Sequence, residues 1–598
     1  MTPSSHEGMG GIVQADGAAF RVWAPHAEKV FVTGAFNGWS KEANPLAAEE
    51  GGCWSAEVAG AKVSDEYRFV VHHGGQELFR NDPYARMLTS SDGNSILYDP
   101  AAFDWGGDAF TPPPWNELAL YEMHVGTFND LPGGGPGTFA DAAEKLPYLR
   151  GLGVNAVELM PIAEFPGGFS WGYNPSHIFA IERDYGGPDA FKAFVKAAHA
   201  HGIAVILDVV YNHFGPGDLG LWRFDGWSEN DLGGIYFYND WRAETPWGQT
   251  RPDYGRSEVR QFIRDNAFLW LDEYRVDGLR WDATAYIRNV RGAANPAEDL
   301  PDGWSLMREI NDAIKARHPG KISIAEDLRG NEWVTRDTAA GGAGFDAQWH
   351  AGFVHPVREA VVHPEDAARN LDSVAAALAH RFNVDAFERV IYTESHDEVA
   401  SGKARVPQEI SPSDADSYFA RKRSALGAAL ALTAPGIPML FQGQEFLEDE
   451  WFRDQVPVDW TGQERYRGIL GMYKDLLALR LSREGRTRGL TGQSIQVHHL
   501  DHENKVLAFH RWKEGGAGDD VVVVLNLANR SHENYRIGFP RAGRWTLRLN
   551  SDAKVYDPEF TDFPSTEVQA DGNGMDGMPA GGSLGIGAYT VLVYSQDE

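Results

Sequence analysis

Cysteine and long apolar stretches are scarce in this chain. Cys53 is the only cysteine among 598 residues, so an internal disulfide cannot form and no cysteine pair can bind a transition metal. No apolar run approaches the roughly 20 residues that cross a bilayer. The start, Met-Thr-Pro-Ser-Ser-His-Glu, lacks a basic segment followed by an apolar one. We therefore expect a cytoplasmic protein with no membrane partner and no transition metal.

Positive charge is also scarce. The chain has 54 Lys and Arg against 85 Asp and Glu, a formal net charge of -31 at pH 7 and a pI of about 5.0. Nucleic acids and anionic membranes would be repelled, so neither is expected as a partner. Aromatic residues make up 12% of the chain and include 19 Trp. Burial in larger hydrophobic cores would explain most of these rings. Flat apolar rings also stack on the C–H faces of sugars. A neutral partner such as a sugar is compatible with the negative net charge of the chain.

The length indicates several domains, because one hydrophobic core rarely grows this large. In residues 1–105, short β-rich runs such as 20–23 and 30–32 alternate with turn residues, which predicts an N-terminal β-sandwich. A proline run at 112–114 then interrupts the chain and predicts a linker.

Residues 491–598 predict a second, C-terminal β-sandwich. β-rich runs return at 506–510, 521–525 and 544–549, after a region that is largely helical. The Gly-rich segment 572–587 contains no clear strand pattern, so we expect it to form a loop.

Strands alternate with amphipathic helices in the region between the sandwiches, residues 106–490. One predicted helix, 189–201, places apolar residues at i, i+3, i+4 and i+7 on one face; others are expected at 141–152 and 259–274. Eight strand-like runs are expected at 118–124, 156–160, 204–208, 277–282, 322–326, 345–349, 390–394 and 438–442. Eight such alternations predict a (β/α)₈ TIM barrel with loop insertions. An open doubly wound sheet is the alternative, but no Gly-rich phosphate loop follows any of these strands.

Polar residues follow four of the predicted strands. Barrel enzymes carry their chemistry beyond the C-terminal ends of the strands, so we expect these side chains to meet at one rim. They are Asp208, Asn212 and His213 after the third strand, Arg280 and Asp282 at the end of the fourth, Glu326 after the fifth, and His396 and Asp397 after the seventh.

Three of these carboxylates fit the cleavage of an acetal. Alternate residues of a strand share a face, so Arg280 is expected beside Asp282, where its charge favours the ionised carboxylate. A glycosidic bond needs an anion for its oxocarbenium-like carbon and a proton for its leaving oxygen. We predict Asp282 as the nucleophile and Glu326, which follows an apolar strand, as the general acid and base. Asp397 would bind sugar hydroxyls and favour ring distortion.

The four segments resemble the four short sequence regions of the α-amylase superfamily of glycoside hydrolases, from residue 118 to about 480. The resemblance implies the same three catalytic roles, with Asp397 as the transition-state stabiliser. It also implies that Arg280, His213 and His396 hold the sugar at the cleavage point and that Asp208 supports the arginine.

A further motif, Trp171-Gly172-Tyr173-Asn174-Pro175, resembles one whose tyrosine stacks on that same sugar. We therefore expect Tyr173 at the substrate, together with Trp171 and Trp281. Asn212 stands where many members of the superfamily have a calcium-binding asparagine, so the resemblance leaves calcium open at this position. No other cofactor is expected.

Two groups within the superfamily are similar to this chain, branching enzymes and the trehalohydrolase that releases trehalose from maltooligosyl-trehalose. Segments 121–128 and 158–165 resemble both, and the first 105 residues resemble the N-terminal sandwiches of branching, debranching and trehalose-releasing enzymes. Segments 395–403 and 533–553 are closer to branching enzymes. In contrast, Asp327-Leu328-Arg329 departs from the branching pattern, and 441–445 is more like amylases.

The resemblance implies a retaining enzyme that cleaves α-1,4-glucosidic bonds of an α-glucan or maltooligosaccharide through a covalent glycosyl-enzyme. We favour 1,4-α-glucan branching, in which the cleaved chain is transferred to form an α-1,6 link. An α-amylase-type hydrolase and a trehalohydrolase are the alternatives. An inactive glucan-binding protein is an alternative from another class, which the presence of all three carboxylates disfavours.

Overall fold

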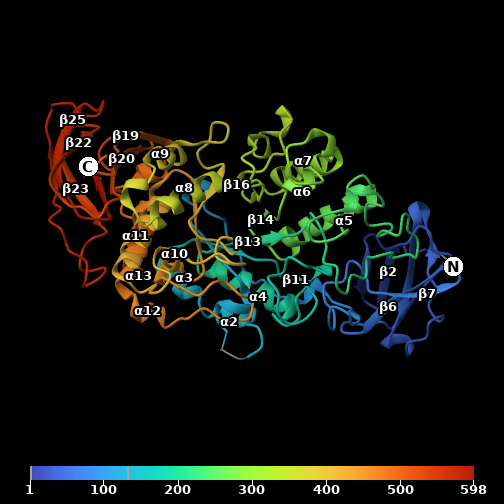
Figure 1. Cartoon of the computed structure of the whole chain (residues 1–598). Coiled ribbons are helices and arrows are strands. Elements are labelled where there is room, and N and C mark those ends of the chain that lie inside the picture. Colours follow the sequence, from blue (N-terminus) through green and yellow to red (C-terminus); the bar gives the residue numbers. More distant parts are fainter. Residues whose placement is uncertain (1–2, 131–133, 598) are drawn as a thin grey trace.

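The computed structural model describes residues 3–130 and 134–597, so the first two residues of the start segment considered above lie outside the described residues. The chain forms a central barrel with β-rich parts at its two ends (Figure 1). The N-terminal strands, in blue, and the C-terminal strands, in red, lie on opposite sides of the barrel. No helix of the described residues combines the length and the apolar character that a membrane span needs.

The N-terminal part is a β-sandwich, as predicted. One sheet has the order β1-β2-β5-β4, and the other has β3-β6-β7 with β8 beside β6. Phe20 and Phe69 from the two sheets meet edge to face in the core between them, where both rings are fully buried. The strands are β1 (Gly10–Gln14), β2 (Gly17–Trp23), β3 (Lys29–Gly34), β4 (Ala47–Ala48), β5 (Cys53–Ala59), β6 (Glu66–His73), β7 (Gln76–Arg80) and β8 (Ser95–Ile96).

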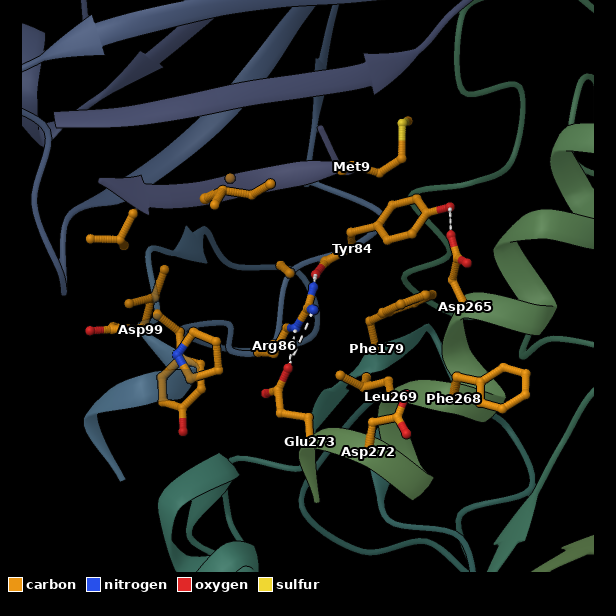
Figure 2. A pocket seen from close by; sticks show the side chains of 18 of the residues that line it. Met9, Tyr84, Arg86, Asp99, Phe179, Asp265, Phe268, Leu269, Asp272 and Glu273 are labelled. Carbon is orange, nitrogen blue, oxygen red and sulfur yellow. Dashed lines mark hydrogen bonds and ion pairs between the residues drawn. The ribbon is translucent and has the colours of Figure 1, made fainter. Parts of the chain in front are cut away.

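The sandwich joins the barrel through polar and aromatic contacts around a cavity of about 540 Å³. Figure 2 shows Tyr84 and Arg86, which lie in the segment between β7 and β8, directed toward carboxylates of the barrel. The Tyr84 hydroxyl donates to Asp265 Oδ2 (3.3 Å), and the Arg86 guanidinium pairs with Glu273 (3.4 Å). Asp265 belongs to α5 (Ser257–Phe268), and Glu273 ends the π-helical turn that follows it (Leu269–Glu273). The sandwich is thereby fixed to the helical segment that precedes β14.

Eight parallel strands close into a barrel, which confirms the predicted fold. The order is β10-β13-β14-β15-β16-β17-β18-β9, and β9 pairs with β10 to complete the ring. The strands are β9 (Leu120–Met123), β10 (Ala156–Leu159), β13 (Ala204–Val209), β14 (Gly278–Trp281), β15 (Ile322–Ala325), β16 (Ala347–Trp349), β17 (Arg389–Ile391) and β18 (Ile437–Phe441). Every residue of these strands is buried, because helices cover the outside and side chains fill the inside.

Helices surround the barrel, and one of the predicted helices is divided. The expected helix 141–152 is two helices, α2 (Phe139–Ala143) and α3 (Leu146–Leu152), because Pro147 lacks the N–H that a continuous helix would need there. The other α-helices are α1 (Val125–Phe128), α4 (Gly187–Ala200), α5, α6 (Ala285–Arg288), α7 (Pro301–Arg317), α8 (Ala351–Val362), α9 (Leu371–Ala379), α10 (Val406–Ile410), α11 (Tyr418–Thr433), α12 (Gly462–Arg465) and α13 (Arg467–Arg480). A small hairpin, β11 (Ala163–Glu164) and β12 (His177–Ile181), extends from the loop after β10.

The C-terminal part has two sheets, β19-β20-β21-β26-β23-β24 and β22-β25, as the predicted sandwich requires. The prediction of a loop across 572–587 is wrong for β25, which pairs with β22. Its glycines reflect crowding, since a Cβ on Gly585 would collide with the carbonyl oxygen of Pro564. The strands are β19 (Ser494–Asp501), β20 (Val506–Trp512), β21 (Val521–Asn526), β22 (His532–Phe539), β23 (Gly543–Asn550), β24 (Val568–Ala570), β25 (Ala580–Ile586) and β26 (Thr590–Ser595).

Candidate active site

The ends of four barrel strands bring the predicted polar side chains to one rim. Asp208 lies in β13 and Arg280 in β14, where the parallel register pairs the two residues. Asp282 and Glu326 each follow directly after a strand, β14 and β15. β17 ends at Ile391, earlier than predicted, so His396 and Asp397 belong to the loop beyond it.

Arg280 is the centre of a buried ion cluster. Its Nη1 lies 2.5 Å from Asp208 Oδ2 and 3.1 Å from Asp282 Oδ1, and its Nη2 lies 3.0 Å from Glu326 Oε2. The guanidinium has no exposed surface and packs 4.3 Å from the centre of the Trp349 ring. We call Arg280, Asp208, Asp282 and Glu326 the Arg280 cluster. Because one guanidinium contacts both Asp282 and Glu326, these two carboxyl groups face the same small space.

Asp282 receives a second hydrogen bond, from Asn212 Nδ2 to Oδ2 (2.9 Å). Burial raises the pKa of Asp282 to about 6, while Arg280 and the Asn212 hydrogen bond lower it. The effect of Arg280 has the predicted direction, but burial is the larger effect. Asp282 is therefore mostly ionised at neutral pH.

Glu326 differs from Asp282 in its protonation. Burial raises its pKa to about 8; Arg280 opposes this rise, and the charges of Asp282 and Asp397 add to it. Glu326 Oε2 accepts a hydrogen bond from the Ala283 N–H (2.7 Å), and Ala283 has a φ of 41°, in the left-handed region. Glu326 therefore carries a proton at neutral pH, beside an ionised Asp282.

His396 is held by a carboxylate at the base of the site. Its Nδ1 lies 2.5 Å from Glu122 Oε1, and its backbone N–H donates to Glu122 Oε2 (3.1 Å). Burial lowers the pKa of His396, but Asp397 and Glu122 outweigh this effect and raise it to about 9. His396 is therefore a cation at neutral pH. Asp397 is the open member of the group, with half of its side chain exposed.

Aromatic rings line the approach to these groups. The half-buried Tyr173 donates to Asp208 Oδ2 (2.6 Å) and stacks on His396, with ring centres 5.0 Å apart. Trp171 packs against the edge of His396 at 6.0 Å. Tyr173, Trp171, His396 and Asp397 thus form a connected group beside the Arg280 cluster.

His213 contacts Asn212, the residue that donates a hydrogen bond to Asp282. It is buried, donates to Asn212 Oδ1 (2.7 Å) and stacks on Trp247 with ring centres 4.5 Å apart. Burial lowers the pKa of His213 to about 4, so this imidazole is neutral where His396 is charged. Trp247 keeps 42% of its surface exposed and is available to a ligand.

The prediction that Trp281 contacts the substrate is wrong. Trp281 has no exposed surface and packs against Tyr211 and Phe345. Successive residues of a strand point to opposite faces, so Arg280 and Asp282 point into the site while Trp281 points outward to the helical layer.

Asn212 does not fit a calcium site. Its Nδ2 donates to Asp282 and its Oδ1 accepts from His213, so both ends of the amide are used within the site. Calcium takes 6–8 oxygen ligands, mostly carboxylates and carbonyls. Across residues 3–130 and 134–597, no group of three or more His, Cys, Asp or Glu side chains is arranged to hold a metal ion. We derive no chemical step through calcium.

Sequence reasoning missed several residues of the site. Glu122, which holds His396, is the second residue of one of the segments that resembled branching enzymes and trehalohydrolases, so that motif was the available signal. Glu158 begins the other. It is buried, burial raises its pKa well above the ordinary value, and within the described part of the chain neither of its oxygens has a hydrogen-bond partner. Trp247 lies in a long loop whose sequence has no periodicity and gave no signal.

Comparison with known proteins identifies the barrel. Residues 122–218 and 222–477 match the family model of the alpha amylase catalytic domain. The chain belongs to the α-amylase family. Two other models match the flanks of this α-amylase family member: carbohydrate-binding module 48, the isoamylase N-terminal domain, at residues 8–85, and the alpha amylase C-terminal all-beta domain at 497–597.

Similar curated proteins include 1,4-alpha-glucan branching enzymes. The chain is 30% identical to "1,4-alpha-glucan branching enzyme GlgB" of Corynebacterium diphtheriae, covering 97% of this chain and 80% of that protein. It is 33% identical to "1,4-alpha-glucan branching enzyme GlgB 2" of Xanthomonas euvesicatoria, covering 90% and 74%.

Solved structures of pullulanases share the fold of this α-amylase family member. The pullulanase of Anoxybacillus sp. LM18-11 complexed with maltotetraose has a TM-score of 0.76 at 21% identity, covering 99% of this chain and 88% of that one. The type I pullulanase of Bacillus subtilis complexed with maltose also has a TM-score of 0.76 at 21% identity, covering 100% and 86%.

Proposed function

We propose that this chain is a retaining 1,4-α-glucan branching enzyme. The observation that carries the cleavage chemistry is the contact of one buried guanidinium with both Asp282 (3.1 Å) and Glu326 (3.0 Å), which supports the action of an anion and an acid on one bond. The choice of branching rests on the relatives named 1,4-alpha-glucan branching enzyme, which match over most of the chain.

In the first step, Asp282 attacks C1 of the donor glucose as the C1–O4 bond breaks. Glu326 gives its proton to the departing O4, so the leaving chain is released as a neutral hydroxyl and the donor chain becomes a glycosyl ester of Asp282. The pKa order of the two groups, about 6 for Asp282 and about 8 for Glu326, provides an ionised nucleophile and a protonated acid at neutral pH.

In the second step, a 6-hydroxyl of a glucan chain attacks the same C1. Glu326, now ionised, takes the hydroxyl proton as the C1–O bond to Asp282 breaks, which restores both carboxyl groups and creates an α-1,6 link. The other side chains hold the donor glucose: Tyr173 by stacking, His396 and His213 by hydrogen bonds, and Asp397 through sugar hydroxyls in the distorted ring.

Hydrolysis is the second candidate function. Water would then replace the 6-hydroxyl in the second step, and all other groups would act in the same way. The segment Asp327-Leu328-Arg329, which departs from the branching pattern directly after Glu326, favours this alternative. We further propose a cytoplasmic enzyme acting on α-glucans, since a single cysteine and a net charge of -31 suit a reducing compartment and a neutral substrate.

Incubation with amylose distinguishes the two functions. Branching removes the iodine stain and creates α-1,6 links, measured by debranching and chain-length analysis, with few new reducing ends. A rise in reducing ends in step with the loss of stain would refute branching and establish hydrolysis. No change in the glucan would refute both.

A further inference from the structure

A pocket distinct from the cavity beneath the N-terminal sandwich lies near Glu326, the general acid of the proposed mechanism. Its volume is about 370 Å³, within the usual range of small-molecule sites, and its lining includes Arg288, Asp299, Trp304, Asn331 and Trp333. Arg288 ends α6, and Trp304 lies in the first turn of α7, two helices that lie side by side near β14 (Figure 1). Asn331 and Trp333 come from the loop that follows β15 and Glu326.

An ion pair links this pocket to the residue after Glu326. Arg288 lines the pocket, and its guanidinium binds both oxygens of Asp327, at 2.7 and 3.0 Å. Asp327 is the residue after Glu326, whose carbonyl oxygen accepts from the Thr284 N–H (2.9 Å) just before α6. The pocket is thus built from the two segments that carry Asp282 and Glu326.

The lining suits a neutral ligand with many hydroxyl groups. Trp333 exposes 42% of its surface, and the half-buried Trp304 is fixed by a hydrogen bond from Nε1 to the Gly341 carbonyl (3.1 Å). Asp327 neutralises Arg288. Asn331 Oδ1 accepts from the Trp333 N–H, while within the described residues its Nδ2 has no partner. Aromatic faces with a few free polar groups are the elements with which proteins bind sugars.

The acceptor chain is expected on the same side of the donor C1 as Glu326. Glu326 protonates the departing O4 and later takes a proton from the attacking hydroxyl, so the leaving and the attacking chains both lie on its side of C1. In the proposed mechanism the donor glucose stacks on Tyr173, which lies against His396, and Trp171 packs on the same imidazole. We propose that the Trp304–Trp333 pocket binds the acceptor α-glucan chain and presents its 6-hydroxyl to the glycosyl ester of Asp282. This proposal rests on the proposed branching function.

The test uses amylose as donor and a maltodextrin with a fluorescent reducing end as a separate acceptor, with the full-length protein. Trp333→Ala is the main variant, because an exposed ring can be removed with little effect on folding, and Trp304→Phe is the second. Phe419→Ala is the matched control, since Phe419 is also 42% exposed but lies in α11. Thermal melting verifies that each variant folds.

Trp333→Ala is expected to raise the acceptor concentration for half-maximal labelled branched product about tenfold, which equals about 1.4 kcal/mol. The KM for amylose, measured by loss of iodine stain, should stay within twofold, and Trp304→Phe should show a smaller change in the same direction. Unchanged acceptor dependence in Trp333→Ala, or an equal rise in both constants, would overturn the acceptor pocket while wild-type branching stands. Wild-type protein that yields only reducing ends would overturn the branching function and the acceptor role together.

Discussion

The hydrogen bond from Asn212 to Asp282 gives a prediction about pH dependence. Activity requires an ionised Asp282 and a protonated Glu326, so kcat/KM should fall as pH decreases through about 6 and as it increases through about 8. Asn212 lowers the pKa of Asp282 and is not among the groups that act on Glu326. Asn212→Ala should therefore shift the acidic limb of the kcat/KM profile to higher pH and leave the basic limb at the wild-type pH.

The size of this shift follows from the bond that is lost. A hydrogen bond to a charged group is worth about 1.5 kcal/mol or more, and one pKa unit corresponds to about 1.4 kcal/mol, so the acidic limb should rise by about one unit. The dependence of kcat/KM on pH is then narrower in the variant, and its pH optimum lies above that of the wild type because only the acidic limb has moved. Initial rates at low amylose concentration between pH 5 and 9 give kcat/KM directly.

His213→Ala is the control for this experiment. Asn212→Ala also removes the partner of His213 Nδ1, whereas His213→Ala keeps the donation to Asp282 while it loses the contacts of His213 with Asn212 and Trp247. The control should have lower activity with both limbs unmoved. The reasoning is refuted if the acidic limb of Asn212→Ala stays at the wild-type pH, or if both limbs shift by the same amount.

Two further predictions concern single residues. Glu326→Gln keeps the size of the side chain but has no proton to give, so kcat should fall by about 10²–10⁴-fold while the thermal midpoint changes little; a fall below tenfold would remove Glu326 from the acid role. Trp281→Ala opens a cavity behind β14 and should cost about 3–5 kcal/mol of unfolding free energy in urea, with the KM for amylose unchanged in the folded protein; a raised KM at wild-type stability would return Trp281 to the substrate site.

The barrel and its rim could be predicted because their signals are local. Strands buried on both faces are short apolar runs, and the polar residues that follow them mark the end where the strands stop. Alternation along β14 placed Arg280 and Asp282 together correctly. The same alternation turns the Trp281 side chain away from the site. The prediction that Trp281 contacts the substrate was wrong because the alternation was applied to Arg280 and Asp282 but not to the residue between them.

The remaining features depend on contacts between distant segments. Glu122 reaches His396 from the opposite end of the barrel sequence, and no spacing in the chain encodes that contact. Trp247, Trp304 and Trp333 lie on or beside loops, where burial leaves no periodic pattern. The strand β25 has glycines where strands usually have branched residues, and only its partner β22 and the crowding by Pro564 explain them.

The charges of the site explain why a proton stays where the reaction needs one. Arg280 and His396 supply the positive charge, while Asp208, Asp282 and Glu326 lie in contact with the arginine, and Asp397 and Glu122 with the histidine. Five carboxyl groups in contact with two cations leave an excess of negative charge, which a buried site reduces by protonating carboxyl groups. Glu326 has the higher pKa of the two groups around the reacting centre, so the proton is on the side chain that faces the leaving oxygen. When the ester forms, the charge of Asp282 disappears at the moment when Glu326 loses its proton. The cluster then carries the same net charge before and after cleavage, and the surrounding groups need no rearrangement between the two steps.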